Sequence, residues 1–279
     1  MFSSDKPYPV FIILLIALLF SCSSGFHDEF YDDNGNLVER EWYDKQNLES
    51  TTTYLNPDHT EYIYTSWYSD GRLNDSARYI NDTLDGLRKF YEKNTGLVHY
   101  ENYNYGVLNG VHKAVYNSGV TSFEGYRKDN WKVGEWKFHF PNGNPITYEY
   151  YDSVGKLLYF RKYDNEGNVL KETGKELIGV TIKQTSVNES ESCTGFVEAA
   201  VPPGNKTILS IAEEIPGQNP DEFFTTEMKK PKIKWETRFD SPGDKKLLFT
   251  LKVKEIKTGE EETYTFEQKI KVNAKSIDD

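Results

Sequence analysis

The sequence predicts an all-β protein, in which a repetitive antiparallel β-hairpin sheet or solenoid is followed by an immunoglobulin-like β-sandwich. Three observations lead to this prediction. Glycines recur at a regular spacing between residues 30 and 176, as Gly119, Gly143 and Gly167 show; β-branched and aromatic residues dominate this part of the chain; and the regular spacing stops near Glu176. A regular spacing of this kind indicates stacked structural units, and the residue preferences favour strands.

The N-terminal residues predict export. Val10 to Phe20 is an uninterrupted apolar run of eleven residues, whereas a membrane-spanning helix needs about 20. The run fits a signal-peptide core, so we expect residues 1–21 to be a signal peptide and residues 22–29 a tether. Leu19-Phe20-Ser21-Cys22 resembles the bacterial lipobox, which implies acylation of Cys22 and a lipid anchor in the membrane. A signal cleaved without lipidation and an uncleaved anchor are the alternatives.

This resemblance also indicates where the protein is expected to be located. It implies a cell-envelope protein of a bacterium. Ser23 follows the cysteine where an aspartate would retain a lipoprotein in the inner membrane, so the outer membrane is the expected location.

The repeats occupy residues 30–176, and Gly134 to Gly155 is the clearest copy. Trp136 and Phe138 alternate with polar residues on one strand, Pro141 to Asn144 forms a turn, and Tyr148 and Tyr150 alternate on the returning strand. Each repeat period, the spacing from Gly119 to Gly143, is therefore two short strands and two turns. In the N-terminal copies Asn47 and His59 stand where glycine is expected, and both residue types tolerate positive φ.

A stretch of this repeat is similar to a known family. Glu124 to Gly143, with its Gly-Glu-Trp and Asn-Gly elements, resembles the bacterial variant of the MORN repeat (membrane occupation and recognition nexus). The resemblance covers roughly Phe30 to Glu172 and implies stacked hairpins. Proteins with this repeat are often labelled as antitoxin components of toxin–antitoxin pairs, so it also implies an antitoxin or immunity role as an alternative.

The remaining residues, 177–279, lose this rhythm and predict a β-sandwich domain. Turn signals rich in proline and glycine separate the longer strands that we expect at Leu177–Val187, Gly195–Val201, Thr207–Ile215, Ile233–Phe239, Leu247–Ile256 and Thr263–Val272. Six or seven strands in about 100 residues are typical of an immunoglobulin-like sandwich. We expect Trp235 in its core.

The search for reactive motifs predicts a protein without catalytic residues, cofactor or metal. Gly-x-Ser-x-Gly, His-Glu-x-x-His, Cys-x-x-Cys and a phosphate-binding glycine loop are absent, and the five histidines lack ligand spacing. A calcium loop with Gly35 at its sixth position would need a carboxylate at the first position, where Phe30 stands. The formal net charge of −11 argues against nucleic acid as a partner. With Cys22 acylated, Cys193 has no disulfide partner and is expected to be buried.

Aromatic residues are the candidates for binding. Tyr100 and Tyr103 must face opposite sides of a strand, as must Tyr150 and Tyr151, so one of each pair is expected to face solvent. Together with Trp131, these residues suggest a surface that binds another envelope protein or a glycan. Cross-strand packing that stiffens the sheet is the alternative. The expected function is a non-catalytic envelope scaffold, or alternatively a carbohydrate- or peptidoglycan-binding module.

Overall fold

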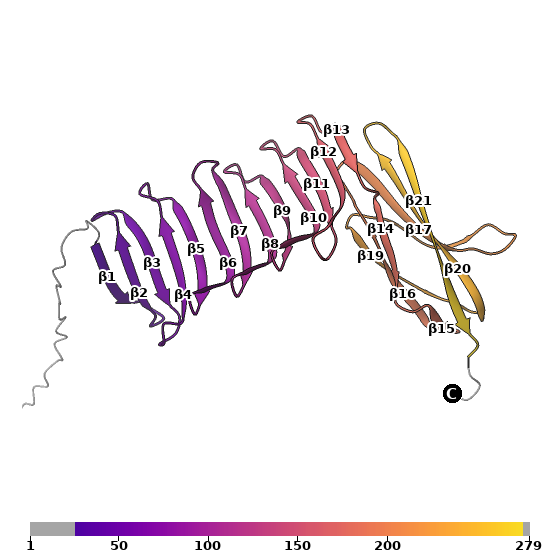
Figure 1. Ribbon diagram of the computed structural model, residues 1–279, viewed down its shortest axis with the longest axis horizontal. Helices are drawn as coiled ribbons and strands as arrows, with labels where there is room; N and C mark the ends of the chain where they lie inside the picture. Colours follow the sequence, from indigo (N-terminus) through magenta and orange to yellow (C-terminus); the bar gives the residue numbers. More distant parts are fainter. Residues whose placement is uncertain (1–25, 276–279) are drawn as a thin grey trace, which may run out of the picture.

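The computed structural model describes residues 26–275, and over this range the chain forms strands and turns without a helix. Thirteen of the strands build one antiparallel sheet in which every strand pairs with its neighbours in the chain. These strands follow one another along the long axis of the molecule (Figure 1). They are β1 (Phe26–Tyr31), β2 (Leu37–Trp42), β3 (Leu48–Tyr54), β4 (Glu61–Trp67), β5 (Leu73–Ile80), β6 (Thr83–Glu92), β7 (Leu97–Asn104), β8 (Val107–Val115), β9 (Thr121–Lys128), β10 (Trp131–His139), β11 (Pro145–Tyr151), β12 (Leu157–Tyr163) and β13 (Val169–Thr173).

This sheet confirms the prediction of an all-β fold built from consecutive hairpins. β10 and β11 form the predicted hairpin, and Gly143 between them has a φ of 88°. The backbone N–H of Gly143 donates to the carbonyl of Phe140 at 2.8 Å, which closes the turn. His59 has a φ of 56°, as expected for a residue that replaces glycine.

The prediction for Asn47 is wrong, because Asn47 is not among the residues with positive φ. The carboxylate of Asp44 organises this turn instead. It accepts the backbone N–H groups of Gln46 and Asn47 at 2.9 and 3.0 Å and the side-chain amide of Asn47 at 2.7 Å. These bonds hold the turn without a left-handed residue.

The long sheet begins earlier than the predicted boundary at residue 30, because β1 starts at Phe26. Arg40 of β2 donates two hydrogen bonds to the carboxylate of Asp28, at 2.8 and 2.7 Å. Its guanidinium also lies 4.6 Å from the ring centre of Phe30. These contacts fasten residues 26–29 to the sheet. The predicted signal peptide (1–21), Cys22 and residues 23–25 lie outside the described residues.

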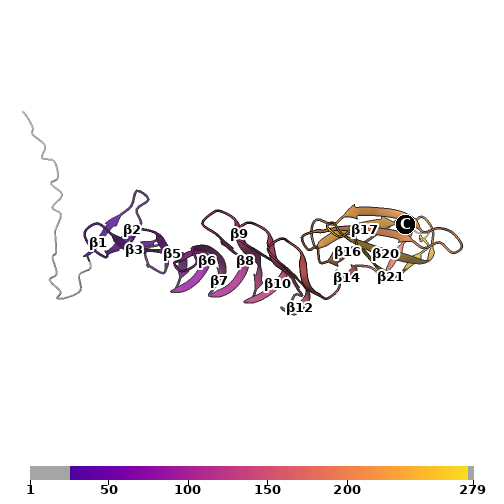
Figure 2. The same ribbon diagram turned by 90° about the horizontal axis from the view of Figure 1, so that it is seen from above.

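The sheet has two faces, because neighbouring side chains on a strand point to opposite sides. We call the face that carries Arg88, His112 and Trp136 the packed face, because large side chains on this face cover the small residues of neighbouring strands. Trp136 itself is 1% exposed. We call the opposite face, which carries Leu87, Val111 and Tyr126, the open face. Figure 2 shows the sheet nearly edge-on, with the second domain continuing beyond its end.

The second domain consists of two sheets around one core. A three-stranded sheet has the order β14-β16-β19, and a five-stranded sheet has the order β15-β21-β20-β17-β18. The strands are β14 (Leu177–Ile182), β15 (Ser186–Asn188), β16 (Ser192–Ala199), β17 (Asn205–Glu213), β18 (Asp221–Glu227), β19 (Lys232–Arg238), β20 (Gly243–Glu255) and β21 (Glu261–Asn273). Trp235 and Cys193 are buried in this core, as expected.

Two details of this domain differ from the prediction. The expected strand Leu177–Val187 is divided into β14 and β15, which belong to different sheets. The strand β18 was not expected at all. It lies at a sheet edge with most of its side chains exposed, so its sequence lacks the alternation of apolar and polar residues that marks a half-buried strand.

The second domain packs on the open face at the C-terminal end of the long sheet. Tyr148, Tyr150, Tyr159 and Tyr163 share a buried cluster with Ala200 of the second domain. The hydroxyl of Tyr148 accepts the backbone N–H of Val201 at 2.9 Å, and the hydroxyl of Tyr163 donates to the carbonyl of Pro203 at 2.8 Å. These contacts join the two domains through tyrosine hydroxyls.

Candidate functional site

Exposed apolar side chains form a row along the open face. Ile63, Leu87 and Val111 follow one another at intervals of one repeat period on β4, β6 and β8, and Tyr126 of β9 pairs with Val111. Their exposed fractions are 37, 52, 49 and 48%, respectively. Arg78 of β5 and Asn102 of β7 separate the first three members, while Val111 and Tyr126 are direct neighbours. Exposed apolar residues gathered on one face indicate an interaction site.

A row of basic residues runs beside the apolar row. Lys89, Lys113 and Lys137 again follow at intervals of one repeat period, and Arg161 continues the series. Each of these basic residues lies two positions after a residue of the apolar row, or after the residue that takes the same place in a later repeat. Its side chain is therefore on the open face. The Nζ atoms of Lys89 and Lys113 lie 5.7 and 4.9 Å from the ring centre of Tyr100. The open face therefore presents apolar and cationic groups side by side.

Both rows run into a hollow where the second domain meets the sheet, which we call the junction pocket. It has a volume of about 500 Å³. The sheet contributes Val111, Tyr126, Val133, Tyr150, Glu124, Glu135 and Lys137, and the β18–β19 loop with the start of β19 contributes Lys230, Pro231 and Lys232. Its floor is largely apolar, and two exposed lysines stand on its rim.

One of the two acidic side chains that line this pocket already has polar partners. Glu135 makes an ion pair with Lys137 at 3.1 Å and accepts the hydroxyl of Tyr148 at 3.0 Å. Among the described residues, neither Lys230 nor Lys232 makes an ion pair. Glu124 also lines the pocket without an ion pair among the described residues, so two lysines and one carboxylate are left available, and their net charge is positive. This balance suits an apolar group that carries an anionic end.

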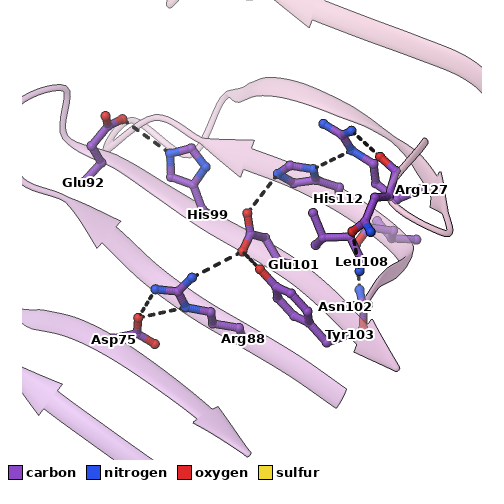
Figure 3. Close-up of polar contacts among 12 residues, drawn as sticks. Asp75, Arg88, Glu92, His99, Glu101, Asn102, Tyr103, Leu108, His112 and Arg127 are labelled. Carbon is purple, nitrogen blue, oxygen red and sulfur yellow. Dashed lines mark hydrogen bonds and ion pairs between the residues drawn. The ribbon is translucent and has the colours of Figure 1, made fainter. Parts of the chain in front are cut away.

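The packed face holds a polar network that links four strands (Figure 3). Arg88 donates to the carboxylate of Asp75 at 2.8 Å and lies 3.6 Å from Glu101. Glu101 accepts the hydroxyl of Tyr103 at 2.8 Å and lies 3.5 Å from Nε2 of His112. The arrangement alternates basic and acidic side chains across the strands, and such cross-strand pairs stabilise a sheet.

The protonation of His112 follows from its surroundings. Burial lowers the pKa of this imidazole, and the neighbouring Arg127 lowers it further, against the opposing effect of Glu101. Nε of Arg127 donates to Nδ1 of His112 at 3.3 Å, so the ring is neutral and its proton lies on Nε2, toward Glu101. Apart from the buried Oδ1 atom of Asp75, which has no hydrogen-bond partner, these groups pair with one another within the sheet, and we therefore interpret the network as structural.

A second hollow lies on the packed face, near the N-terminal end of the sheet, and is lined by tyrosines. It has a volume of about 440 Å³, and its walls are Thr52, Tyr54, His59, Tyr62, Tyr64, Tyr79 and Asp82. The rings of Tyr54 and His59 stack at 4.2 Å, and those of Tyr62 and Tyr79 stack at 5.1 Å. Burial and a hydrogen bond to Asp82 raise the pKa of Tyr62 to about 12. We call this the tyrosine hollow.

The aromatic residues singled out from the sequence do not gather in one place. Tyr100 lies on the open face between two lysines, while Tyr103 and Tyr151 lie on the packed face and donate to Glu101 and Glu149 at 2.8 and 2.7 Å. Trp131 begins β10 and is 63% exposed. The expected alternation within each tyrosine pair is therefore present, but it divides the candidates between two faces.

Tyr150 has to be removed from the set of candidate binding residues. It is 4% exposed, and its hydroxyl donates to Glu198 of the second domain. Burial, chiefly, and this hydrogen bond raise its pKa. The reason is tertiary, since the second domain covers the open face at this strand.

Sequence reasoning missed the residues that form the two rows of the open face. Leu87 and Val111 are separated by one repeat period, and so are Lys89 and Lys113. The turn glycines have the same spacing, so the signal was present in the sequence. In the described part of the chain no group of three or more metal-ligating side chains comes together.

Comparison with family models and curated proteins identifies no relative. No model of a protein family matches the chain, and no curated protein matches it. Over residues 26–275 there is also no helix with the length and apolar character needed to cross a bilayer.

Proposed function

We propose that this chain is a non-catalytic, lipid-anchored protein of the bacterial cell envelope, whose long sheet binds another envelope protein through the open face. The observation that carries the proposal is the pair of parallel rows on the open face. The apolar row is exposed from β4 to β9, and the basic row runs beside it from Lys89 of β6 to Lys137 of β10. Strands in a sheet lie about 4.8 Å apart, so equivalent side chains two strands apart recur about every 10 Å. Such spacing suits an extended partner surface.

Other observations support this assignment. Repeat stacks offer broad surfaces and not deep clefts, and most polar groups in the network of the packed face pair with one another within the sheet. The lipobox-like residues before Cys22 support anchoring, with the outer membrane as the location. The hairpin sheet is the arrangement that the resemblance to bacterial MORN-type repeats implies.

The test uses the full, lipidated chain in native membranes. We expect the triple variant Leu87→Ser, Val111→Ser, Tyr126→Ser to lose chemical cross-linking to its partner, because these side chains supply the apolar contact area. A matched control replaces Leu157, Val154 and Tyr105 by serine, which are also exposed (44, 72 and 67%) but lie outside the open face. Cross-linking that survives in the first variant as well as in the control would exclude the open face.

The tyrosine hollow favours a second candidate function, the binding of a carbohydrate such as a peptidoglycan fragment. His59 adopts positive φ where the neighbouring turns at Gly35 and Gly71 use glycine, and a strained residue that lines a hollow is often functional. We expect soluble peptidoglycan fragments to perturb the NMR signals of Tyr62 and Tyr79 in the parent chain and not in the His59→Gly variant. Unchanged tyrosine signals in the parent chain would count against this function.

We also infer that the second domain is an immunoglobulin-like sandwich. Its sheet orders, β14-β16-β19 and β15-β21-β20-β17-β18, correspond to strands A-B-E and A′-G-F-C-C′ of such a sandwich. The parallel pairing of β15 with β21 supports this correspondence. Domains of this kind commonly serve in binding and display, which agrees with a scaffold.

A further inference from the structure

We propose that the junction pocket binds an extended acidic segment of the partner protein, with small apolar side chains on its floor and a carboxylate at Lys230 and Lys232. This inference rests on the proposed function and adds the site and the chemistry of the partner. Three observations support it. A segment of this chain's own second domain already packs on the last strands of the open face, equivalent side chains in earlier repeats are uncovered, and lysines stand on the rim of the pocket.

The second domain supplies the template for such a ligand. Its segment from Glu198 to Asn205 lies across the last strands of the open face. Glu198 accepts the hydroxyl of Tyr150, the N–H of Val201 donates to Tyr148, and Asn205 accepts from Arg161 at 2.7 Å. Ala200 is buried between the tyrosines. An extended segment with a carboxylate and small apolar side chains therefore fits these rows.

Earlier repeats keep parts of the same receiving surface, and these parts are uncovered. One repeat period earlier, Tyr126 takes the position of Tyr150 and Lys137 that of Arg161. Two periods earlier, Tyr100 takes the position of Tyr148. The junction pocket lies where this uncovered surface adjoins the docked segment, so a partner segment would lie beside the chain's own and continue the same interface.

The charge of the rim selects an acidic ligand. Lys230 and Lys232 are exposed and lie in a stretch that also contains Lys229 and Lys234, in a chain whose net charge is −11. Lys232 lines the pocket, and its ammonium group lies 4.9 Å from the ring centre of Phe196. Opposite charges across an interface fix the register of a partner and suppress wrong ones.

The shape of the site favours a protein segment over an anionic membrane surface. The junction pocket is a hollow beside a loop, and Glu124 and Glu135 line it together with the lysines. The exposed carboxylate of Glu124, which has no ion pair among the described residues, repels a uniformly anionic bilayer. A segment with one carboxylate and neutral neighbours can instead place its charge on the lysines alone.

The experiment measures binding of a fluorescent peptide with the template sequence Phe-Val-Glu-Ala-Ala-Val-Pro-Pro to the full chain carrying Cys22→Ala. We expect Lys230→Glu with Lys232→Glu to weaken binding about tenfold, as two lost charge contacts predict. The same reversal should strengthen binding of the peptide whose glutamate is replaced by lysine. The control, Lys229→Glu with Lys234→Glu, changes the net charge equally outside the pocket and should alter binding by less than about twofold.

Other outcomes overturn the inference in distinct ways. Equal weakening by both variants would show a general charge effect without a site. Unchanged peptide binding in the Lys230/Lys232 variant would exclude the junction pocket, and so would an absence of binding by the parent chain. Flotation with phosphatidylglycerol vesicles that is lost only in the Lys230/Lys232 variant would assign the site to a membrane surface. In each case the cross-linking test of the open face still decides the proposed function by itself.

Discussion

Gly125 offers the sharpest test of how the packed face is held together. A Cβ added to this residue would stand 2.2 Å from Cδ2 and 2.3 Å from Cε2 of Trp136. Carbon atoms in contact prefer about 3.5–4.0 Å, so Gly125→Ala must displace the indole by more than about 1 Å. The collision involves the centre of the ring system, which no rotation of a flexible chain end can relieve.

The cost follows from what the indole contacts. Its Nε1 donates to the carbonyl of Tyr126 at 3.2 Å, and the cationic groups of Arg127 and Lys132 lie 5.0 and 4.8 Å from its ring centre. Overpacking costs about 1–3 kcal/mol, a lost hydrogen bond about 0.5–1.5 kcal/mol and each cation–π contact about 0.5–1 kcal/mol. Partial loss of these contacts predicts a decrease of about 2–4 kcal/mol in the free energy of unfolding.

The assay is urea denaturation of the parent chain and the variants, with hydrogen exchange of the β9 and β10 amides to localise the effect. In the Trp136→Ala background the obstruction is gone, so Gly125→Ala should be neutral or stabilising by about 0.5 kcal/mol, because alanine is the better strand residue. Gly179→Ala is the matched control, since Gly179 lies in strand β14 without a positive φ and its added Cβ meets no atom within 4 Å. An equal loss of stability in both backgrounds would refute the reasoning.

Four further results are expected. Gly143→Val should lower the free energy of unfolding by about 1–2 kcal/mol, because φ is 88° at this open turn, while Gly143→Asn should be tolerated; equal effects in urea denaturation would contradict the turn. His112 has a lowered pKa, so its contribution to stability is present above the unfolded pKa of about 6.5 and is lost as the pH falls toward the folded value; His112→Gln should flatten this dependence, and an unaltered pH profile would reject it. Arg161→Ala should cost about 3–5 kcal/mol by leaving the buried Glu176 without its cation at 3.4 Å, and Glu176→Gln should recover part of the loss in a double-mutant cycle; no recovery would argue against the pair. Cys22→Ala should abolish palmitate labelling and release the protein from membranes, and persistent labelling would exclude lipidation at Cys22.

The hairpin repeat was predictable because its signals are local. Regularly spaced glycines with positive φ and alternating aromatic residues define turns and strands within a short window. Gly125 shows the limit of such reasoning. It lies outside the ladder of turn glycines, and its role depends on Trp136, which reaches it across the strand pair β9–β10.

The candidate site was less predictable because it depends on contacts between domains. Alternation correctly places Tyr150 and Tyr151 on opposite faces, but only the docked second domain decides that Tyr150 is buried. The junction pocket likewise combines Val111 and Tyr126 with Lys230, which lies far from both in the chain. No local pattern contains that information.

The strict succession of strands also fixes a distance. Twelve intervals between the 13 strands, each about 4.8 Å, carry the second domain about 58 Å from β1. With a lipid attached before β1, as we propose, the sheet becomes a stiff strut that sets how far from the bilayer the sandwich can work. Insertion or removal of one repeat of two strands would change that reach by about 10 Å while leaving both faces in register, so the length of the strut can vary in evolution independently of the surfaces it carries.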